Sequence, residues 1–287
     1  RIAKVFGIMN GTCNYILTRM GNEGISFADC LKDAQALGYA EADPTFDVEG
    51  FDTAHKLSIL ATLCFGYEIA PDKMRVEGIS GITQHDIQVA ADLGYKIKLL
   101  GIAERTEDGI EQRVHPTFVP KGSAIAGVDG VMNAVALETD HVHELLLAGP
   151  GAGGPPTASS VLSDILDIAR GTRVPPLGVP SDELLPYREA PNRAHSGGFY
   201  IRLSAKDVPG ALAAIATRMG EKSISIDSVI QRSDLSAKAV APDGSPTRTV
   251  VMITQQTLEA SVREALAEIA ADGFIVGQPQ LIRIEKL

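Results

Sequence analysis

The sequence predicts an α+β protein in two parts, a mixed or antiparallel sheet with helices followed by a smaller ferredoxin-like βαββαβ unit. Its 287 residues suffice for two domains that each bury a core. Strand patterns joined by short turns fill residues 95–149, which is typical of an antiparallel sheet. Five prolines within residues 171–196 then mark a linker. We therefore expect a first domain at residues 1–178, a linker at 179–196 and a second domain at 197–287.

The chain opens with a strand and two capped helices. Residues 2–8 form an apolar run typical of a strand, and Thr12 follows a turn where it is placed to cap the next helix. Ser26, with Asp29 three residues later, resembles a capping box that opens a second helix. Gly38 is expected to end that helix.

A third helix begins near Asp52, and its apolar residues recur at helical spacing. Four of them are expected to form one core-facing stripe: Leu57, Leu60, Ala61 and Cys64. The other elements of the first domain are a capped helix at 83–94, strands at 95–105, 111–119, 131–138 and 141–149, and a helix at 155–170 that starts near Thr157 or a preceding proline.

The second domain alternates strands and helices. Its strands are expected at residues 198–205, 222–231, 248–255 and 274–284, and its helices at 209–220 and 258–270. This βαββαβ order is the ferredoxin-like arrangement. The segment at 234–246, rich in Ala, Ser, Asp and Pro, is expected to form a loose hairpin loop.

Composition and charge argue against several classes of protein. The net charge is −10 and no block of Lys and Arg occurs, which argues against nucleic-acid binding. No long uncharged apolar run predicts a membrane span, and no signal-peptide pattern is present. Cys13, Cys30 and Cys64 are isolated thiols, which favours the reducing cytoplasm. Because Arg1 leads directly into an apolar strand, we expect the chain to be the middle of a longer polypeptide.

An acidic stretch, residues 38–56, lies in front of the third helix and extends into its first turns. Its carboxylates are Glu41, Asp43, Asp47, Glu49 and Asp52, and they precede a single lysine, Lys56. Such carboxylates can hold a small cationic ligand, and a lysine among them can donate a proton. The alternative is a solvated acidic loop. The spacing does not match an EF-hand loop, so we expect no calcium site.

Asp52 and Lys56 lie four residues apart near a helix N-terminus and therefore share a face. An exposed ion pair of this kind contributes less than about 1 kcal/mol, and that is the simplest interpretation. The helix is otherwise apolar, and the pair shares its stripe with Ile59 and Leu63. We therefore expect Lys56 to be partly desolvated, which would tune how readily it donates a proton.

Residues 149–154, GPGAGG, match the pattern G-x-G-x-x-G without being a dinucleotide fingerprint, because the following helix does not lead into a strand. A glycine-rich turn that opens a helix can still offer N–H groups to a phosphate supplied by another domain. A plain tight turn is the alternative.

Two further motifs have a structural and a functional interpretation. His141 and His143 lie on one side of a predicted strand, but without a third ligand we favour surface or interface histidines over a metal site. Asp207 to Gly210, DVPG, joins the first strand and helix of the second domain. From the residues alone we favour a capped connection over a small-molecule loop.

Three segments of the chain resemble one enzyme family. Residues 38–56, GYAEADPTFDVEGFDTAHK, preceded by Ala34, resemble the signature of homoserine dehydrogenase over its full length. Residues 7–17, GIMNGTCNYIL, and residues 149–159, GPGAGGPPTAS, resemble further blocks of that family in the same order. This resemblance covers residues 1–178, and the DVPG module resembles an ACT domain, the amino-acid-sensing ferredoxin-like fold.

The resemblance implies an enzyme that interconverts L-homoserine and L-aspartate 4-semialdehyde with NADP or NAD, in threonine, methionine and isoleucine biosynthesis. It implies Lys56 as the proton donor to the aldehyde oxygen. It also implies substrate contacts from Glu41, Asp52, Asp47, Tyr39 and Thr12, cofactor contacts from Gly38 and Gly153, and a regulatory amino acid, expected to be threonine, at Asp207 and Gly210.

The dinucleotide fingerprint of the family does not occur in this sequence. We expect the cofactor to be bound mainly by an N-terminal domain outside it, and the chain alone not to oxidise NADPH at a robust rate. Edge strands in both domains predict a homodimer or homotetramer.

Two other functions are also consistent with the sequence. One is a non-catalytic ACT-type amino-acid sensor whose acidic loop is structural, and the other is a different dehydrogenase of amino-acid semialdehydes. The change Lys56→Ala in the full-length enzyme separates the first of these from catalysis. A large loss of kcat favours catalysis, and unchanged turnover favours the sensor.

Overall fold

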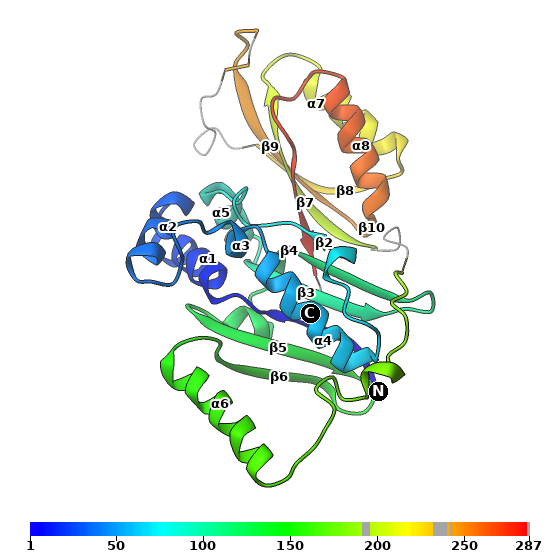
Figure 1. Cartoon of the computed structure of the whole chain (residues 1–287). Coiled ribbons are helices and arrows are strands. Elements are labelled where there is room, and N and C mark those ends of the chain that lie inside the picture. Colours follow the sequence, from blue (N-terminus) through cyan, green and yellow to red (C-terminus); the bar gives the residue numbers. More distant parts are fainter. Residues whose placement is uncertain (191–195, 232–239, 242, 286–287) are drawn as a thin grey trace. The chain divides into compact units, whose positions relative to one another are not determined.

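The computed structural model describes residues 1–190, 196–231, 240–241 and 243–285. The chain divides into two compact units, Arg1–Pro191 and Asn192–Lys286 (Figure 1). Part of the predicted linker lies along the first unit. The amide of Glu68 donates to the carbonyl of Leu185 at 2.9 Å, and the amide of Ile110 donates to the carbonyl of Arg188 at 2.9 Å.

The first unit is built on an antiparallel sheet with strand order β6-β5-β1-β3-β4. Its strands are β1 (Ile2–Ile8), β3 (Tyr95–Arg105), β4 (Ile110–Pro120), β5 (Met132–Thr139) and β6 (His143–Pro150), and the short β2 (Arg75–Val76) pairs parallel to β4. In the centre of the sheet, Phe6 lies opposite Ile102 on one side and Ala136 on the other. The predicted antiparallel sheet is therefore confirmed.

The helices of this unit supply part of the candidate site. They are α1 (Gly11–Glu23), α2 (Phe27–Ala36), α3 (Thr45–Val48), α4 (Phe51–Phe65), α5 (Gln84–Asp92) and α6 (Gly154–Ala169), with 3₁₀ turns at Pro71–Lys73, Ala124–Gly127 and Ser181–Glu183. α1, α4 and α5 pack on β3, whereas α6 stands apart from the sheet (Figure 1). One core cluster gathers Phe6, Ile8, Leu100, Ile102, Val119 and Ala136.

The helix starts confirm two predicted caps and correct a third. The Ser26 side chain accepts a hydrogen bond from the Asp29 amide, and Thr83 forms a full capping box with Asp86. The prediction for Thr12 was wrong, because α1 begins at Gly11 and its N-cap is Asn10, two residues before Thr12. A short amide side chain just before the first turn can reach the free N–H groups there, which a residue inside the helix cannot do.

The buried face of α4 agrees only in part with the predicted one. Leu57 and Ala61 are buried as expected, whereas Leu60 and Cys64 are partly exposed. The buried face also includes small polar residues, Thr53, Ser58 and Thr62. The prediction followed apolar residues alone. A polar residue such as Thr62 can also lie on the buried face, because its hydroxyl donates a hydrogen bond to the Ser58 carbonyl of the same helix at 3.1 Å.

The second unit has the predicted ferredoxin-like topology. Its elements are β7 (Ser196–Lys206), α7 (Ala211–Glu221), β8 (Ile226–Ile230), β9 (Thr247–Thr254), β10 (Thr257–Leu258), α8 (Glu259–Ala271) and β11 (Gln280–Ile284). The strand order is β11-β7-β9-β8 with antiparallel pairing, and α7 and α8 contribute to one core with the sheet. The hairpin loop predicted at 234–246 falls largely outside the described residues. Among the helices that are described, none has the length and apolar character needed to cross a membrane.

Candidate active site

A cavity of about 450 Å³ in the first unit collects almost every site residue that the sequence predicted there. Its lining includes Lys56, Asp52, Asp47, Tyr39, Thr12, Gly38 and Gly153, together with the unpredicted Asn10, Gly11, Asn133 and Gly151. Glu41 does not line it. The cavity lies where α1, α4 and α6 begin and where α2 ends, so residues far apart in sequence meet at helix termini.

Asn10 organises the acidic side of this cavity. Its Nδ2 donates to Asp47 Oδ1 at 2.7 Å and to Asp52 Oδ2 at 2.9 Å. Its Oδ1 accepts from the Cys13 amide at 2.8 Å, which caps α1. One side chain therefore fixes two carboxylates and starts a helix. The Asn-Gly turn was visible in the sequence. The pairing of Asn10 with Asp47 and Asp52, which lie 37 and 42 positions further along the chain, was not.

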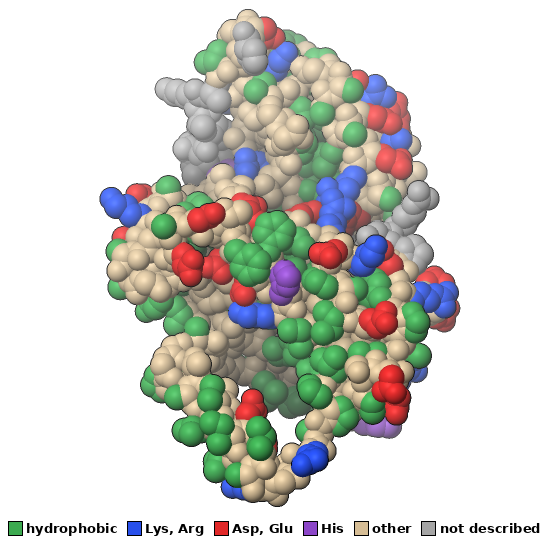
Figure 2. Space-filling model, viewed as in Figure 1, with side chains coloured by type: hydrophobic (Ala, Val, Ile, Leu, Met, Phe, Trp, Pro, Cys, Tyr) green, Lys and Arg blue, Asp and Glu red, His purple; other side chains and the backbone are tan. Residues whose placement is uncertain are grey.

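Lys56 lies one turn after Asp52 on α4 and points to the Asp52 carboxylate, which Asn10 also contacts. Its Nζ donates to Asp52 Oδ2 at 2.7 Å and to the Met9 carbonyl at 3.1 Å. Lys56 was expected to be partly desolvated, and 48% of its side chain is exposed, so the desolvation extends to about half of the side chain. Ile59 and Leu63, which share its stripe, are exposed as well, so this face of α4 is its outer face. Figure 2 shows hydrophobic side chains gathered over α3 and α4.

Asp47 is partly buried, and burial is the main reason why its pKa lies above the usual value. The hydrogen bond from Asn10 and the charge of Lys56 lower that pKa, and the charges of Asp52 and Glu41 raise it. The nearby Cys13 thiol is fully buried and donates to the Asp47 carbonyl at 3.2 Å. Burial and the acidic neighbours raise the pKa of this thiol, so it is an inert group rather than a nucleophile.

Thr12 and Tyr39 close one side of the cavity. Thr12 Oγ1 donates to the Tyr39 carbonyl at 2.6 Å, which ties the end of α2 to the start of α1. The ring of Tyr39 lies edge-on to that of Tyr15, with centroids 5.2 Å apart and an interplanar angle of 66°. These contacts orient Tyr39 while leaving its side chain nearly half exposed.

Asp43 and Glu41 contribute to the loop rather than to the cavity lining. Asp43 accepts from both the amide and the hydroxyl of Thr45, at 3.1 and 2.6 Å, and so stabilises the start of the short helix α3. This helix was not predicted. The Glu41 carbonyl accepts from Gln35 Nε2 at 3.0 Å, and its exposed side chain reaches the cavity only through its charge.

Two glycine positions leave backbone open toward the cavity. Gly38 has φ = +77° and Gly153 has φ = +116°, values that favour glycine. Space beside Gly38 is open, since an added Cβ would meet no heavy atom within 4 Å. The expected row of free N–H groups at the start of α6 is reduced, because Pro155 and Pro156 carry none.

Asn133 is a second polar residue that sequence reasoning missed. It lines the cavity from β5, and Gly151 packs so closely on it that an added Cβ would lie 2.1 Å from its Nδ2. Its Oδ1 is buried and accepts no hydrogen bond within the described part of the chain. A buried acceptor of this kind is satisfied by a ligand or by water.

The other candidate motifs lie away from this cavity. His141 lies in the turn between β5 and β6, and His143 has φ = +62° at the start of β6, so the prediction of one shared strand was wrong. In the second unit Gly210, with φ = +90°, precedes α7 and offers no side-chain cap. Asp207 Oδ2 accepts from Arg248 Nε at 2.6 Å.

Comparison with known proteins agrees with this geometry. The family model for homoserine dehydrogenase matches residues 1–166, and the model for the ACT domain matches residues 199–271. A homoserine dehydrogenase of Pseudomonas aeruginosa is 44% identical over 293 residues, which cover 100% of this chain and 66% of the relative. One of Bacillus subtilis is 37% identical over 273 residues, covering 94% of this chain and 61% of the relative. The chain thus spans slightly less than two thirds of these relatives.

Solved structures agree with the curated relatives. The crystal structure of a homoserine dehydrogenase from Thiobacillus denitrificans matches with a TM-score of 0.87 and 44% identity, over 99% of this chain and 64% of that one. A hyperthermophilic archaeal homoserine dehydrogenase in complex with NADPH matches with a TM-score of 0.50 and 28% identity, over 59% of this chain and 48% of that one. The chain therefore belongs to the homoserine dehydrogenase family and carries an ACT domain.

Proposed function

We propose that this chain supplies the substrate site of an NADP- or NAD-dependent homoserine dehydrogenase, which interconverts L-homoserine and L-aspartate 4-semialdehyde. The observation that carries the proposal is the Lys56–Asp52 pair inside a cavity whose second carboxylate, Asp47, is held by Asn10. The family membership supports it, since the Pseudomonas aeruginosa relative and the Thiobacillus denitrificans structure are both homoserine dehydrogenases.

The charges of the cavity suit the substrate's ammonium group. Asp47 and Asp52 against Lys56 leave a net charge of −1 among the ionisable side chains that touch the cavity, apart from Tyr39. Asp52 and Asp47 would hold the ammonium by charge-assisted hydrogen bonds, and Glu41 would add to the negative field. Thr12 and Tyr39 would line the rest of the substrate pocket, and the buried Oδ1 of Asn133 could accept a bond from the ligand.

Lys56 is proposed to move the proton. In the reducing direction the aldehyde carbon gains a hydride, which the reduced nicotinamide supplies when bound, and the aldehyde oxygen gains a proton from Lys56 Nζ. The Asp52 carboxylate, 2.7 Å from Lys56 Nζ, holds the Lys56 side chain in place through this step. Because almost half of the side chain is exposed, Lys56 can recover its proton from water.

The residues at the cavity fit the nicotinamide end of a cofactor. Gly38 and Gly153 leave open backbone there, and a volume of about 450 Å³ is that of a small-molecule pocket rather than of a whole dinucleotide. We therefore assign Gly38 and Gly153 to contacts near the reacting ring. The choice between NADP and NAD belongs to groups that bind the adenosine end.

Binding of L-homoserine to this chain tests the substrate site and separates it from the sensor alternative. Calorimetry should show saturable binding that Asp52→Asn weakens by at least about tenfold, because one charge-assisted hydrogen bond to the ammonium is lost. Asp207→Asn in the second unit should leave this binding unchanged. If Asp207→Asn abolishes binding and Asp52→Asn does not, the chain is an amino-acid sensor and the proposal fails.

We further propose that the ACT domain binds a regulatory amino acid, with threonine as the expected effector, at Asp207 and Gly210. The left-handed Gly210 exposes the start of α7, and Asp207 is oriented by Arg248. A homodimer or homotetramer is proposed from the apolar surface of α6 and the edge position of β6. The isolated free thiols Cys13, Cys30 and Cys64 support a cytoplasmic location.

A further inference from the structure

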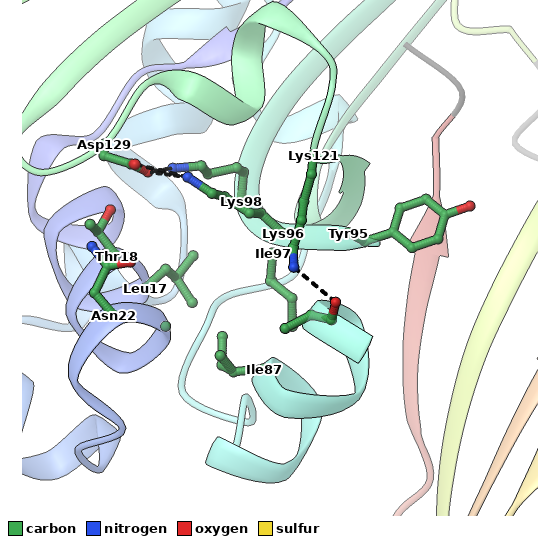
Figure 3. Close-up of a pocket in the computed structure, with 12 residues that line it drawn as sticks. Leu17, Thr18, Asn22, Ile87, Tyr95, Lys96, Ile97, Lys98, Lys121 and Asp129 are labelled. Carbon is green, nitrogen blue, oxygen red and sulfur yellow. Dashed lines mark hydrogen bonds and ion pairs between the residues drawn. The ribbon is translucent and has the colours of Figure 1, made fainter. Parts of the chain in front are cut away.

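A second cavity, of about 220 Å³, lies in the first unit between α1, α5 and the start of β3 (Figure 3). We call it the lysine cavity, because Lys96, Lys98 and Lys121 line it together with one carboxylate, Asp129. Three ammonium groups and one carboxylate give these four side chains a net charge of +2. The residues that line the lysine cavity are distinct from those that line the candidate active site.

The innermost lysine is structural. Lys98 has a side chain that is 2% exposed, and its Nζ donates to Asn14 Oδ1 at 2.9 Å, to the Val128 carbonyl at 2.6 Å and to Asp129 Oδ1 at 2.9 Å. These three bonds use all the donors of an ammonium group. Asp129 is shared, because Lys96 Nζ also donates to both of its oxygens, at 3.0 and 2.8 Å.

Among the described residues, no carboxylate forms an ion pair with the outer lysine, Lys121. Lys121 Nζ donates to the Ala91 carbonyl in the last turn of α5 at 2.9 Å, as Figure 3 shows. In the described ranges of the chain, this carbonyl is its single acceptor, so two of its three N–H groups remain for a ligand. An anion at Lys121 would therefore gain hydrogen bonds without displacing Asp129 from its partners.

The walls of the lysine cavity are apolar. Leu17 of α1, Ile87 of α5 and Ile97 of β3 face one another there (Figure 3). All three side chains are buried, so they form a closed apolar wall that a short hydrocarbon body would contact and a bare anion such as phosphate would not. The volume lies below the range usual for drug-sized ligands, so the ligand is small.

We propose that the lysine cavity binds a small aliphatic monocarboxylate. Its carboxylate would accept hydrogen bonds from the remaining N–H groups of Lys121, and its hydrocarbon body would pack between Leu17, Ile87 and Ile97. The positive charge of the cavity thus selects the carboxylate end of the ligand, and the apolar wall selects its hydrocarbon end. The site is independent of the proposed substrate cavity and would exist whatever reaction that cavity performs.

Titration calorimetry of the chain, at constant ionic strength, tests this site with two probes, sodium isovalerate and inorganic phosphate. Isovalerate should bind saturably and at least about tenfold more tightly than phosphate, because it alone carries a hydrocarbon body that packs against the apolar wall. Lys121→Met, which keeps most of the side chain but removes the charge, should weaken isovalerate by about tenfold. Lys32→Met, at an exposed position of α2, is the matched control and should change nothing.

A second variant protects the test against loss of the fold. Gly21→Leu keeps every charge, sits on a helix and would fill the cavity beside Ile87, whose nearest methyl lies 3.8 Å from an added Cβ. It should abolish isovalerate binding while the circular dichroism spectrum stays that of the wild type. The proposal is overturned if isovalerate does not saturate, if phosphate binds equally well, or if Gly21→Leu binds as tightly as the wild type.

Discussion

Asn10 is the residue on which the candidate site depends most. It caps α1 and holds Asp47 and Asp52 through one amide group, so the geometry of the acidic cavity is coupled to the start of a helix. Substrate-binding carboxylates that are fixed before the ligand arrives lose little freedom on binding. The site is therefore built by a residue that carries no charge itself.

Asp47 makes the stability of the first unit depend on pH. Its pKa in the folded chain is raised, mainly by burial, so the folded state holds the proton more tightly than the unfolded state. Its contribution is therefore fully present below the unfolded pKa of about 3.9 and is lost as the pH rises through the folded pKa. We predict that Asp47→Asn gains stability relative to the wild type as the pH rises from acid to neutral.

Urea unfolding from acid to neutral pH measures this effect. The expected result is a difference in unfolding free energy, variant minus wild type, that increases with pH. Asp43→Asn is a useful contrast, because its hydrogen bonds from Thr45 lower the pKa of Asp43. For Asp43→Asn, the difference in unfolding free energy, variant minus wild type, should decrease as the pH rises. A constant difference for Asp47→Asn across the pH range would contradict a raised pKa of Asp47 in the folded chain.

At the scale of elements, α1 connects the two cavities. Its first residues line the candidate active site, and its later turns line the lysine cavity. Between them Asn14, 2% exposed, donates to the carbonyls of Val128 and Met132 and accepts from Lys98. The helix is thus fixed to β3 and to the segment before β5 by one buried amide.

We predict that Asn14→Ala destabilises the first unit by about 2–3 kcal/mol, because it leaves buried partners, including a lysine, without a hydrogen bond. Equilibrium unfolding in urea measures the loss. Asn22→Ala, at an exposed position on the same helix, is the control and should change the unfolding free energy by less than about 0.5 kcal/mol. Equal effects of the two changes would contradict the role given to Asn14.

The strands were predictable from the sequence, and the helix details less so. β1 and β3 have the predicted bounds, since alternation and apolar runs are local signals. The cap at Asn10 was missed because Thr12 is an equally good cap in isolation. The four-residue α3 was missed because one turn shows no periodicity.

The candidate site was predictable as a list of residues but not as a geometry. The acidic stretch and its family resemblance pointed to Lys56, Asp52 and Asp47, which all line the cavity. Glu41 was placed in the site by resemblance and lies outside the cavity lining. Asn10 and Asn133 were missed, because their roles depend on residues brought together by the sheet and not by the sequence. Lys56 was expected to be partly desolvated because its neighbours on α4 are apolar. Those neighbours are exposed too, since an apolar pattern alone does not reveal which face of a helix is buried.

At the scale of the whole molecule, α6 has an exposed apolar face that no other element of its own unit covers in the described residues. None of its residues is buried, although it carries five large apolar side chains: Val161, Leu162, Ile165, Leu166 and Ile168. Figure 2 shows hydrophobic side chains gathered over this helix. An amphipathic helix gains most of its stability by packing that face, so α6 is expected to pack against a second copy of the chain.

We predict that the double change Leu162→Glu and Ile165→Glu converts the protein to a monomer, because two charges would be buried in the contact. Size-exclusion chromatography with light scattering measures the mass. The matched change Ser163→Glu places a charge on the opposite face of α6 and should leave the oligomer intact. A wild-type protein that is already monomeric would contradict the assignment of this surface.

The proton role of Lys56 is the central claim, and the steady-state kinetics of Lys56→Ala in the full-length natural protein test it most directly. Loss of a general acid should lower kcat by roughly 10²–10⁴-fold while homoserine still binds, because the carboxylates that hold its ammonium remain. Lys32→Ala, on the exposed side of α2, should keep the kcat of the wild type. A kcat of Lys56→Ala equal to that of the wild type would contradict the account.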